Sequence, residues 1–307
     1  MCYSAQIKSD YLRFVRQWGA DLSLREFVDV FWRRTTDTKV KIPKAMQALF
    51  ASPRSDDERR IAELVDEFAT AEKTRLEQEL FLQRKRLADA ERTLQSKTTK
   101  AATENKRIAS DKIAWAMDKL ADLRRTEPDD EDSRIFPGWY APVMISEGGQ
   151  RVIKPMRYQC RPAGKPASHD IKFPGTYNAR RDNLEGFWKG QFGYTHGILV
   201  VSRFYENVAR DGKNVVLEFD PRPGQDMLVA CLWSRWRAPG EPDLLSFAAI
   251  TDDPPPEIAA AGHDRCIVPI RAQHVDAWLN PDPRNLSALH AILDDRERPH
   301  YEHRLAA

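Results

Sequence analysis

The sequence predicts an α+β fold in which a mostly antiparallel β core is interrupted by a long helical insertion. Residues 55–125 contain no Pro or Gly and are rich in Glu, Lys, Arg, Ala and Leu, as long helices are. Beyond residue 133, short runs of β-branched and aromatic residues alternate with Pro, Gly and Asp, which is typical of antiparallel strands. The expected parts are therefore 1–54, the helical insertion 55–126, and the main part 127–307.

The first part is expected to be helical. Apolar residues recur at helical spacing in Tyr11–Trp18, Ser23–Arg34 and Pro43–Phe50. Ser23 precedes Glu26 by three residues, which predicts a capping box at the start of the second helix.

The insertion carries one weak heptad stripe, because the companion positions three or four residues away are mostly polar. A single helix of this length would extend roughly 100 Å at 1.5 Å per residue, so a hairpin that turns near Ser96–Lys100 is the more compact alternative. We expect a projecting arm that could bind a protein partner. The stripe consists of Leu80, Leu87, Leu94, Ala101, Ile108 and Trp115.

An acidic tract, Glu127–Asp132, leads from the insertion to the strands. Two short helices, 272–279 and 286–293, are expected near the end of the chain. The expected strands are Val143–Ser146, Arg151–Tyr158, Gly197–Val201, Val215–Phe219, Met227–Trp233 and Leu245–Thr251.

Composition limits the class of protein. The 307 residues carry a net charge of +2, and no apolar run is long enough to span a membrane. The N-terminus lacks the layout of a secretory signal, so a cytoplasmic location is expected. The four cysteines, at positions 2, 160, 231 and 266, lack metal-type spacing, so we expect free thiols and neither a metal nor another cofactor.

The start of the chain suggests a reactive group. Aminopeptidases remove Met1 when a small residue follows, which would leave Cys2 with a free amine and a thiol on adjacent carbons. Such a 1,2-aminothiol traps an aldehyde, first as a Schiff base and then as a thiazolidine ring. A second-position cysteine is also common without any function, so Cys2 needs support from the rest of the sequence.

Three segments of the β-rich part supply that support: 176–181 with Asn178, 202–206 with Glu206, and 262–269 with His263. Separately, these residues could be a turn asparagine, a solvated carboxylate and a loop histidine. Together with Cys2 they provide a nucleophile, a carboxylate, an imidazole and a neutral polar donor, a set suited to carbonyl chemistry.

The stretch 151–189 contains nine basic residues against three acidic ones, interleaved with five aromatic residues. Single-stranded nucleic acid is bound by this combination, because cations pair with phosphates and flat rings stack on bases. A solvated basic surface above core aromatics explains the composition equally well.

The chain resembles the SRAP family (SOS response-associated peptidase), whose members process abasic sites. Four family segments occur here in the family order: Met1-Cys2, Asn178-Ala179-Arg180, Arg203-Phe204-Tyr205-Glu206 and His263-Asp264-Arg265. The resemblance covers the first residues and about 130–300, whereas the helical arm has no counterpart in a typical member. It implies a single SRAP-like domain around the insertion.

The resemblance implies that Cys2 crosslinks to abasic sites in single-stranded DNA at the nucleoid, with β-elimination as a lyase side reaction. It implies that Asn178 orients the nucleophile or polarises the sugar oxygen, and that Glu206 and His263 move protons. It also implies DNA contacts for a further set of residues. These are Arg157, Tyr158 for stacking, Arg180 on a phosphate, Arg181 and Thr251.

The chain departs from the family pattern after Cys2, where Tyr3 and Ser4 replace Gly and Arg. Lys8 or Arg13 would then have to replace the missing phosphate-binding arginine. Two other functions stay open: an N-terminal-nucleophile cysteine peptidase with His263 as base, and a non-catalytic DNA-binding scaffold.

Overall fold

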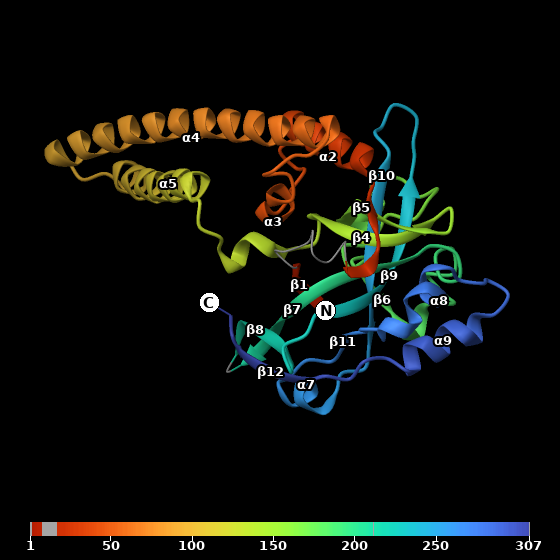
Figure 1. Ribbon diagram of the computed structural model, residues 1–307. Helices are drawn as coiled ribbons and strands as arrows, with labels where there is room; N and C mark the ends of the chain where they lie inside the picture. The colour runs from red at the N-terminus through yellow and green to blue at the C-terminus, as the bar shows by residue number, and fades with distance from the viewer. Residues whose placement is uncertain (1, 8–16, 211, 307) are drawn as a thin grey trace. The chain divides into compact units, whose positions relative to one another are not determined.

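The computed structural model describes residues 2–7, 17–210 and 212–306, with Cys2 and Tyr3 described by their backbone alone (Figure 1). The expected helix 11–18 falls mostly outside these ranges, as do Met1, Lys8 and Arg13. The helices are α2 (Leu24–Thr36), α3 (Lys44–Ala48), α4 (Asp56–Ser96), α5 (Lys100–Arg124), α6 (His169–Lys172), α7 (Pro256–Ala260), α8 (Val275–Leu279) and α9 (Leu286–Asp294).

The strands begin with β1 at Cys2 and end with β12 near the C-terminus. They are β1 (Cys2–Ile7), β2 (Asp21–Leu22), β3 (Arg134–Ile135), β4 (Tyr140–Glu147), β5 (Gln150–Tyr158), β6 (Asn178–Arg180), β7 (His196–Arg210), β8 (Lys213–Arg222), β9 (Met227–Trp236), β10 (Leu244–Asp252), β11 (Cys266–Ile267) and β12 (His300–Leu305). Three short 3-10 helices lie at Asp130–Ser133, Arg181–Asn183 and Ala272–His274.

The described chain forms two compact units. One comprises Met1–Arg59 and Asp130–Ala307, and the other comprises Arg60–Asp129. The first is a mixed unit built on the sheet, and the second is the helical hairpin of α4 and α5 (Figure 1).

Most strand pairs are antiparallel, as the sequence predicts. The pairing closes on itself: β10 pairs with β5, β5 with β4, β4 with β7, β7 with β9, and β9 again with β10. Only the β10–β5 pair in this circuit is parallel. Closure satisfies backbone hydrogen bonds that an open edge would expose. The interior is apolar, with Phe247 stacked on Tyr158 at 5.1 Å between ring centroids.

The long strand β7 links this circuit to the start of the chain. Its first half, from His196 to Val201, pairs with β9. Its second half pairs with β8 on one side and with β1 on the other. The residues from Phe204 to Glu206 therefore lie in the middle of a three-stranded region, where their backbone is held from both sides.

Helix α2 shows why the predicted helices form. Its residues Phe27, Val30, Phe31 and Arg34 are buried, at the spacing of one helical face. Phe50 packs on both phenylalanines, edge to face. Ser23 is the N-cap as expected, but its hydroxyl bonds to the Glu26 carboxylate and caps no helix N–H.

The hairpin turn lies between Ser96 and Lys100, where the sequence places it. The buried stripe, however, runs through Leu76, Gln83 and Ala90 on α4 and through Ala102, Ala109 and Ala116 on α5. The predicted heptad positions lie beside it and are half-buried or exposed. Alanine at every seventh position lets two antiparallel helices approach closely, so small side chains, which hydrophobicity alone ranks low, form the contact.

Among the helices that the structure describes, none is long and apolar enough to cross a membrane. All six predicted strands are present, and each is longer than expected. The short strands β1, β2, β3, β6, β11 and β12 were not expected from the sequence.

Candidate active site and nucleic-acid interface

The pairing of β1 with β7 fixes the position of residue 2. Ser4 lies opposite Tyr205 and Cys2 lies opposite Glu206. The step from Ser4 to Cys2 covers two residues of β1, but the step from Tyr205 to Glu206 covers only one residue of β7. Tyr3 is the extra residue, a β-bulge of the kind found beside active sites. Without this bulge, Asn207 would lie opposite Cys2. The bulge therefore selects Glu206 as the partner position of the residue that carries the thiol.

Glu206 and His263 form a buried pair. The Glu206 side chain is fully buried, and its Oε2 lies 3.3 Å from Nε2 of His263. Nδ1 of His263 lies 2.9 Å from the carbonyl oxygen of Arg265, which can only accept, so Nδ1 carries a proton. Burial lowers the pKa of His263, which favours the neutral imidazole. A favourable contact between Nε2 and the carboxyl group then requires one shared proton.

The loop after α7 places this histidine. Gly262 has φ of +97°, a conformation that favours glycine. A Cβ on Gly262 would also lie 2.9 Å from Cγ1 of Val208. Because glycine has no side chain, the loop lies directly against β7, two residues beyond Glu206.

Asn178 and Thr251 come from the parallel pair β6 and β10. Arg180 is the register partner of Thr251, and Ala249 is that of Asn178. Asn178 is 7% exposed and Thr251 is 1% exposed. Neither the Asn178 amide nor the Thr251 hydroxyl has a hydrogen-bond partner among the described residues. Buried polar groups without partners cost roughly 1–3 kcal/mol each, so their retention points to a ligand that satisfies them.

Asn178 also lines a cavity of about 360 Å³. Arg180 and Arg265 contribute cations to its wall, and Phe173 and Phe187 contribute aromatic rings. These two rings are 38% and 40% exposed, and their centroids lie 5.9 Å apart. A groove with partly exposed aromatic rings, guanidinium groups and an unsatisfied amide is suited to an unpaired nucleotide.

Comparison with known proteins decides the family. The model of the family described as SOS response associated peptidase (SRAP) matches residues 92–304, which is more than half of the chain. The chain belongs to the SRAP family. The matched range includes Asn178, Glu206 and His263 but begins well after Cys2.

Solved structures similar to this SRAP chain include a protein from Bordetella bronchiseptica, with 18% identity and a TM-score of 0.47 over 57% of this chain and 87% of that chain. A protein from Bacteroides thetaiotaomicron has 12% identity and a TM-score of 0.47, over 61% and 82%. A phage-related protein from Bordetella bronchiseptica has 20% identity and a TM-score of 0.43, over 57% and 81%. The comparison with curated proteins found no match.

The arginines expected to contact DNA in this SRAP domain differ in their surroundings. Arg157 is bound to Asp170 at 2.8 Å, and Arg181 lies 3.0 Å from Asp252 and 2.5 Å from Asp294. Arg180 pairs with Asp182 at 2.8 Å, but its side chain is 47% exposed. Arg180 alone of the three lines the groove.

The basic stretch 151–189 is therefore no continuous cationic surface. Its arginines at 151, 157, 161, 180 and 181 and Lys154 all form ion pairs. Tyr158, expected to stack on a base, is 1% exposed and covered by Phe247, so neither ring face is available in this conformation. Phe173 and Phe187 are the aromatic residues of the stretch with exposed rings. Arg265, which belongs to the histidine segment, also lines the groove, a position that the sequence did not predict.

Ser4, which stands where the family has arginine, is fully buried. Its hydroxyl accepts a hydrogen bond of 3.0 Å from Nε of Arg134 on the neighbouring strand β3. The guanidinium of Arg134 lies over the ring of Tyr205, 3.8 Å from its centroid. The residues proposed as replacements, Lys8 and Arg13, lie outside the described ranges.

The described cysteine side chains are poor nucleophiles. Cys160, Cys231 and Cys266 are buried free thiols. Burial raises the pKa of Cys160 to about 12 and raises the pKa values of the other two still further. In the described part of the chain, no group of three or more His, Cys, Asp or Glu side chains could hold a metal ion.

Proposed function

We propose that this SRAP protein senses abasic sites in single-stranded DNA and crosslinks to them through Cys2 after removal of Met1. The observation that carries the proposal is the β1–β7 register, with Cys2 opposite Glu206 and His263 in contact with that carboxyl group. On this proposal the protein works in the cytoplasm and lies at the nucleoid when bound to DNA.

The crosslinking reaction needs proton donation and proton removal at successive steps. An abasic deoxyribose is mostly a closed hemiacetal, and Glu206 with His263 would move the proton that opens it to the aldehyde. The Cys2 amine adds to the aldehyde carbon, and loss of water gives a Schiff base. The thiol then adds to the same carbon and closes the thiazolidine, so one water leaves overall. If the ring fails to close, the Schiff base permits β-elimination, the lyase side reaction.

The groove beside Asn178 would hold the strand. Its exposed rings can stack on a flanking base, and Arg180 and Arg265 can pair with phosphates. The Asn178 amide and the Thr251 hydroxyl would gain from the DNA the hydrogen bonds that they lack among the described residues. We propose a structural role for Arg157 and Arg181 because they are ion-paired, and for Tyr158 because it is buried.

The test is a denaturing gel of the purified protein with an abasic single-stranded oligonucleotide. We expect a slow-migrating covalent band for the wild type and no thiazolidine product for Cys2→Ala. Intact mass must first establish that Met1 has been removed from both proteins.

The proposal is wrong if the processed wild type forms no covalent product. Peptide hydrolysis that depends on Cys2 would favour the peptidase alternative. Equal binding of intact and abasic strands without a covalent product would favour the scaffold.

A further inference from the structure

The half of the hairpin next to its turn is strongly basic. We call residues 84–107 the hairpin tip. It contains eight Lys and Arg residues and three Asp and Glu residues. The rest of the unit, 60–83 and 108–129, contains seven basic and eleven acidic residues. The charge therefore changes sign along the same pair of helices.

The three acidic residues of the tip are all engaged. Asp89 pairs with Arg92 at 3.0 Å, Glu91 with Lys106 at 3.2 Å, and Glu104 with Arg107 at 2.6 Å. Five cations remain, and none of them forms an ion pair among the described residues. They are Arg84, Lys85, Arg86, Lys97 and Lys100.

Four of these five side chains are exposed, and the fifth, Arg86, donates to the side-chain oxygen of Asn105 at 2.6 Å. A groove of about 470 Å³ lies between residues 82–93 of α4 and residues 99–105 at the start of α5. Its polar lining consists of Lys85, Arg86, Thr93, Thr99 and Asn105, together with Asp89, whose carboxylate is paired with Arg92. Cations, hydroxyls and an amide in one groove are the groups that hold phosphate oxygens.

We propose that the hairpin tip is a second nucleic-acid contact, which binds the phosphodiester backbone without regard to sequence. Residues 84–96 extend about 20 Å at 1.5 Å per residue, a length that matches about six phosphates of one strand at 3.4 Å each. Arg84, Lys85 and Arg86 lie at one end of this stretch and Lys97 and Lys100 at the other, so cations can meet phosphates at both ends.

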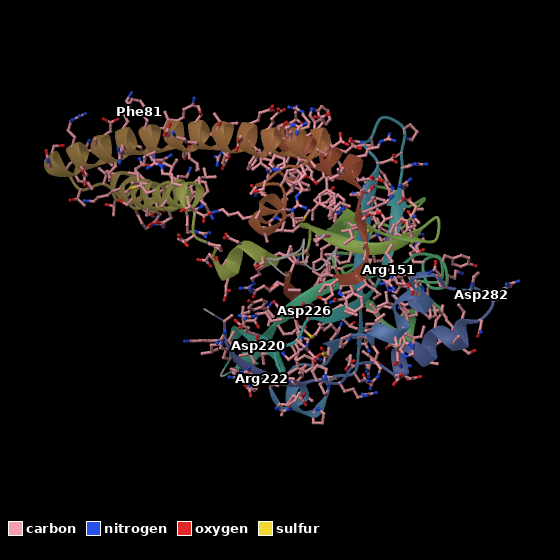
Figure 2. The ribbon with its side chains drawn as sticks, viewed as in Figure 1. Phe81, Arg151, Asp220, Arg222, Asp226 and Asp282 are labelled. Carbon is pink, nitrogen blue, oxygen red and sulfur yellow. The ribbon has the colours of Figure 1, made fainter. Side chains whose placement is uncertain are left out.

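An acidic protein fits the tip less well. Protein interfaces are enriched in aromatic residues and Met and depleted in Lys. The exposed large apolar residues of the hairpin are Phe81, Leu82, Trp115 and Met117, and none of these lies within the tip. Phe81, which is 71% exposed, points outward from α4 and lies outside the hairpin tip (Figure 2).

The test compares two triple variants of the full chain. Lys85→Gln/Lys97→Gln/Lys100→Gln removes three charges from the tip. Lys73→Gln/Lys119→Gln/Arg124→Gln removes three exposed charges from the rest of the hairpin and is the matched control. Gln keeps helix propensity close to that of Lys and Arg, and circular dichroism should show that both variants retain the helices.

Binding is measured by fluorescence anisotropy with intact oligonucleotides that contain no abasic site, single-stranded in one arm and duplex in the other, over a range of salt concentrations. We expect the tip variant to bind roughly tenfold to a hundredfold more weakly than the control near 0.1 M salt. Its salt slope should fall by about 2 for a single strand or about 2.7 for a duplex. The arm with the larger loss identifies the form of nucleic acid.

Equal affinity and equal salt slope for the two variants would overturn the proposal. Because the probe has no aldehyde, this result is independent of the covalent reaction at Cys2. The same two variants mixed with abasic DNA on a denaturing gel report that reaction separately, so failure of one proposal leaves the other assessable.

Discussion

Two buried histidines of the sheet unit differ in what surrounds them. His196 is 2% exposed, its Nε2 accepts from the backbone N–H of Gly193 at 2.9 Å, and its Nδ1 lies 3.1 Å from the Trp278 carbonyl oxygen. His263 is 8% exposed and has one nitrogen on a backbone carbonyl, but its other nitrogen faces the carboxyl group of Glu206.

The contrast is between a histidine bound only by backbone groups and one that contacts a carboxyl group, to which we have assigned proton transfer. Burial lowers the pKa of His196 and so favours the neutral ring, which packs against Trp278 at 4.0 Å between ring centroids. His263 faces a titratable group instead, because its Nε2 lies 3.3 Å from Oε2 of Glu206. Packing accounts for the first arrangement, and the proposed reaction with abasic DNA would account for the second.

Among the variants proposed, Glu206→Gln should have the largest effect, a loss of crosslinking rate at the Glu206–His263 pair. The amide has the same shape and can donate to Nε2 of His263, but it cannot transfer a proton. We expect the crosslinking rate on abasic single-stranded DNA to fall by about 10²–10⁴ with the unfolding free energy little changed. Quantified gel bands against time measure the rate. An unchanged rate would remove Glu206 from the mechanism.

The surroundings of His196 should make the unfolding free energy fall in acid. Burial lowers the pKa of His196 to about 3, so the folded state disfavours the proton that the unfolded state accepts near 6.5. Stability is therefore fully present above pH 6.5 and falls as the pH drops toward 3, by about 3 kcal/mol at pH 4.5.

Urea unfolding at pH 7 and pH 4.5 measures this loss. Asp252 and Asp170, whose pKa values are also lowered in the fold, lose stability in acid as well, so a matched variant is needed. His196→Asn keeps a side-chain donor for the Trp278 carbonyl oxygen and does not titrate. The acid loss should be smaller in this variant by about 3 kcal/mol; identical losses would contradict the assignment.

Thr251→Val tests whether the buried Thr251 hydroxyl lowers the unfolding free energy of the protein. Removing the buried hydroxyl that lacks a partner among the described residues should raise the unfolding free energy by about 1 kcal/mol. The same change should weaken binding to single-stranded DNA. Chemical denaturation and fluorescence anisotropy report the two effects, and a loss of stability would show that the hydroxyl serves the fold.

Arg180→Gln and Arg157→Gln sharpen the comparison among the arginines, with the smallest effects. Arg180 lines the groove, so its loss should lower affinity for an intact single strand several-fold and the salt slope by about 0.7. Arg157 is 16% exposed and ion-paired to Asp170, so its loss should lower stability and leave the salt slope unchanged. The reverse pattern in binding and unfolding measurements would exchange the two roles.

Much of the fold could be predicted because it depends on local pattern. The run without Pro or Gly gave the helices α4 and α5, and β-branched runs gave β4, β5 and β7 to β10. The buried stripe of the hairpin was predicted wrongly because Ala102, Ala109 and Ala116 contribute by being small. Strand β1 was missed because a strand of six residues is recognised by its partners, and these lie some 200 residues away.

The candidate site was predictable as a set of residue types but not as a geometry. Motif order named Asn178, Glu206 and His263, whereas the bulge at Tyr3 and the close approach of Gly262 to β7 depend on backbone pairing. Counting charges in 151–189 could not distinguish Arg157 from Arg180, because the carboxylate of Asp170 reaches its arginine only in the folded chain.

Because of the bulge in β1, the number of residues between Ala5 and Cys2 determines which residue of β7 lies opposite position 2. Distances are counted from Ala5, whose backbone is fixed between Phe204 and Ile135, back to residue 2. Side chains alternate along a strand, so adding or deleting one residue within this short interval would shift position 2 along β7 or turn it to the other face of the sheet. The number of residues between Cys2 and Ala5 is thus as much a part of the proposed chemistry as the identity of Glu206.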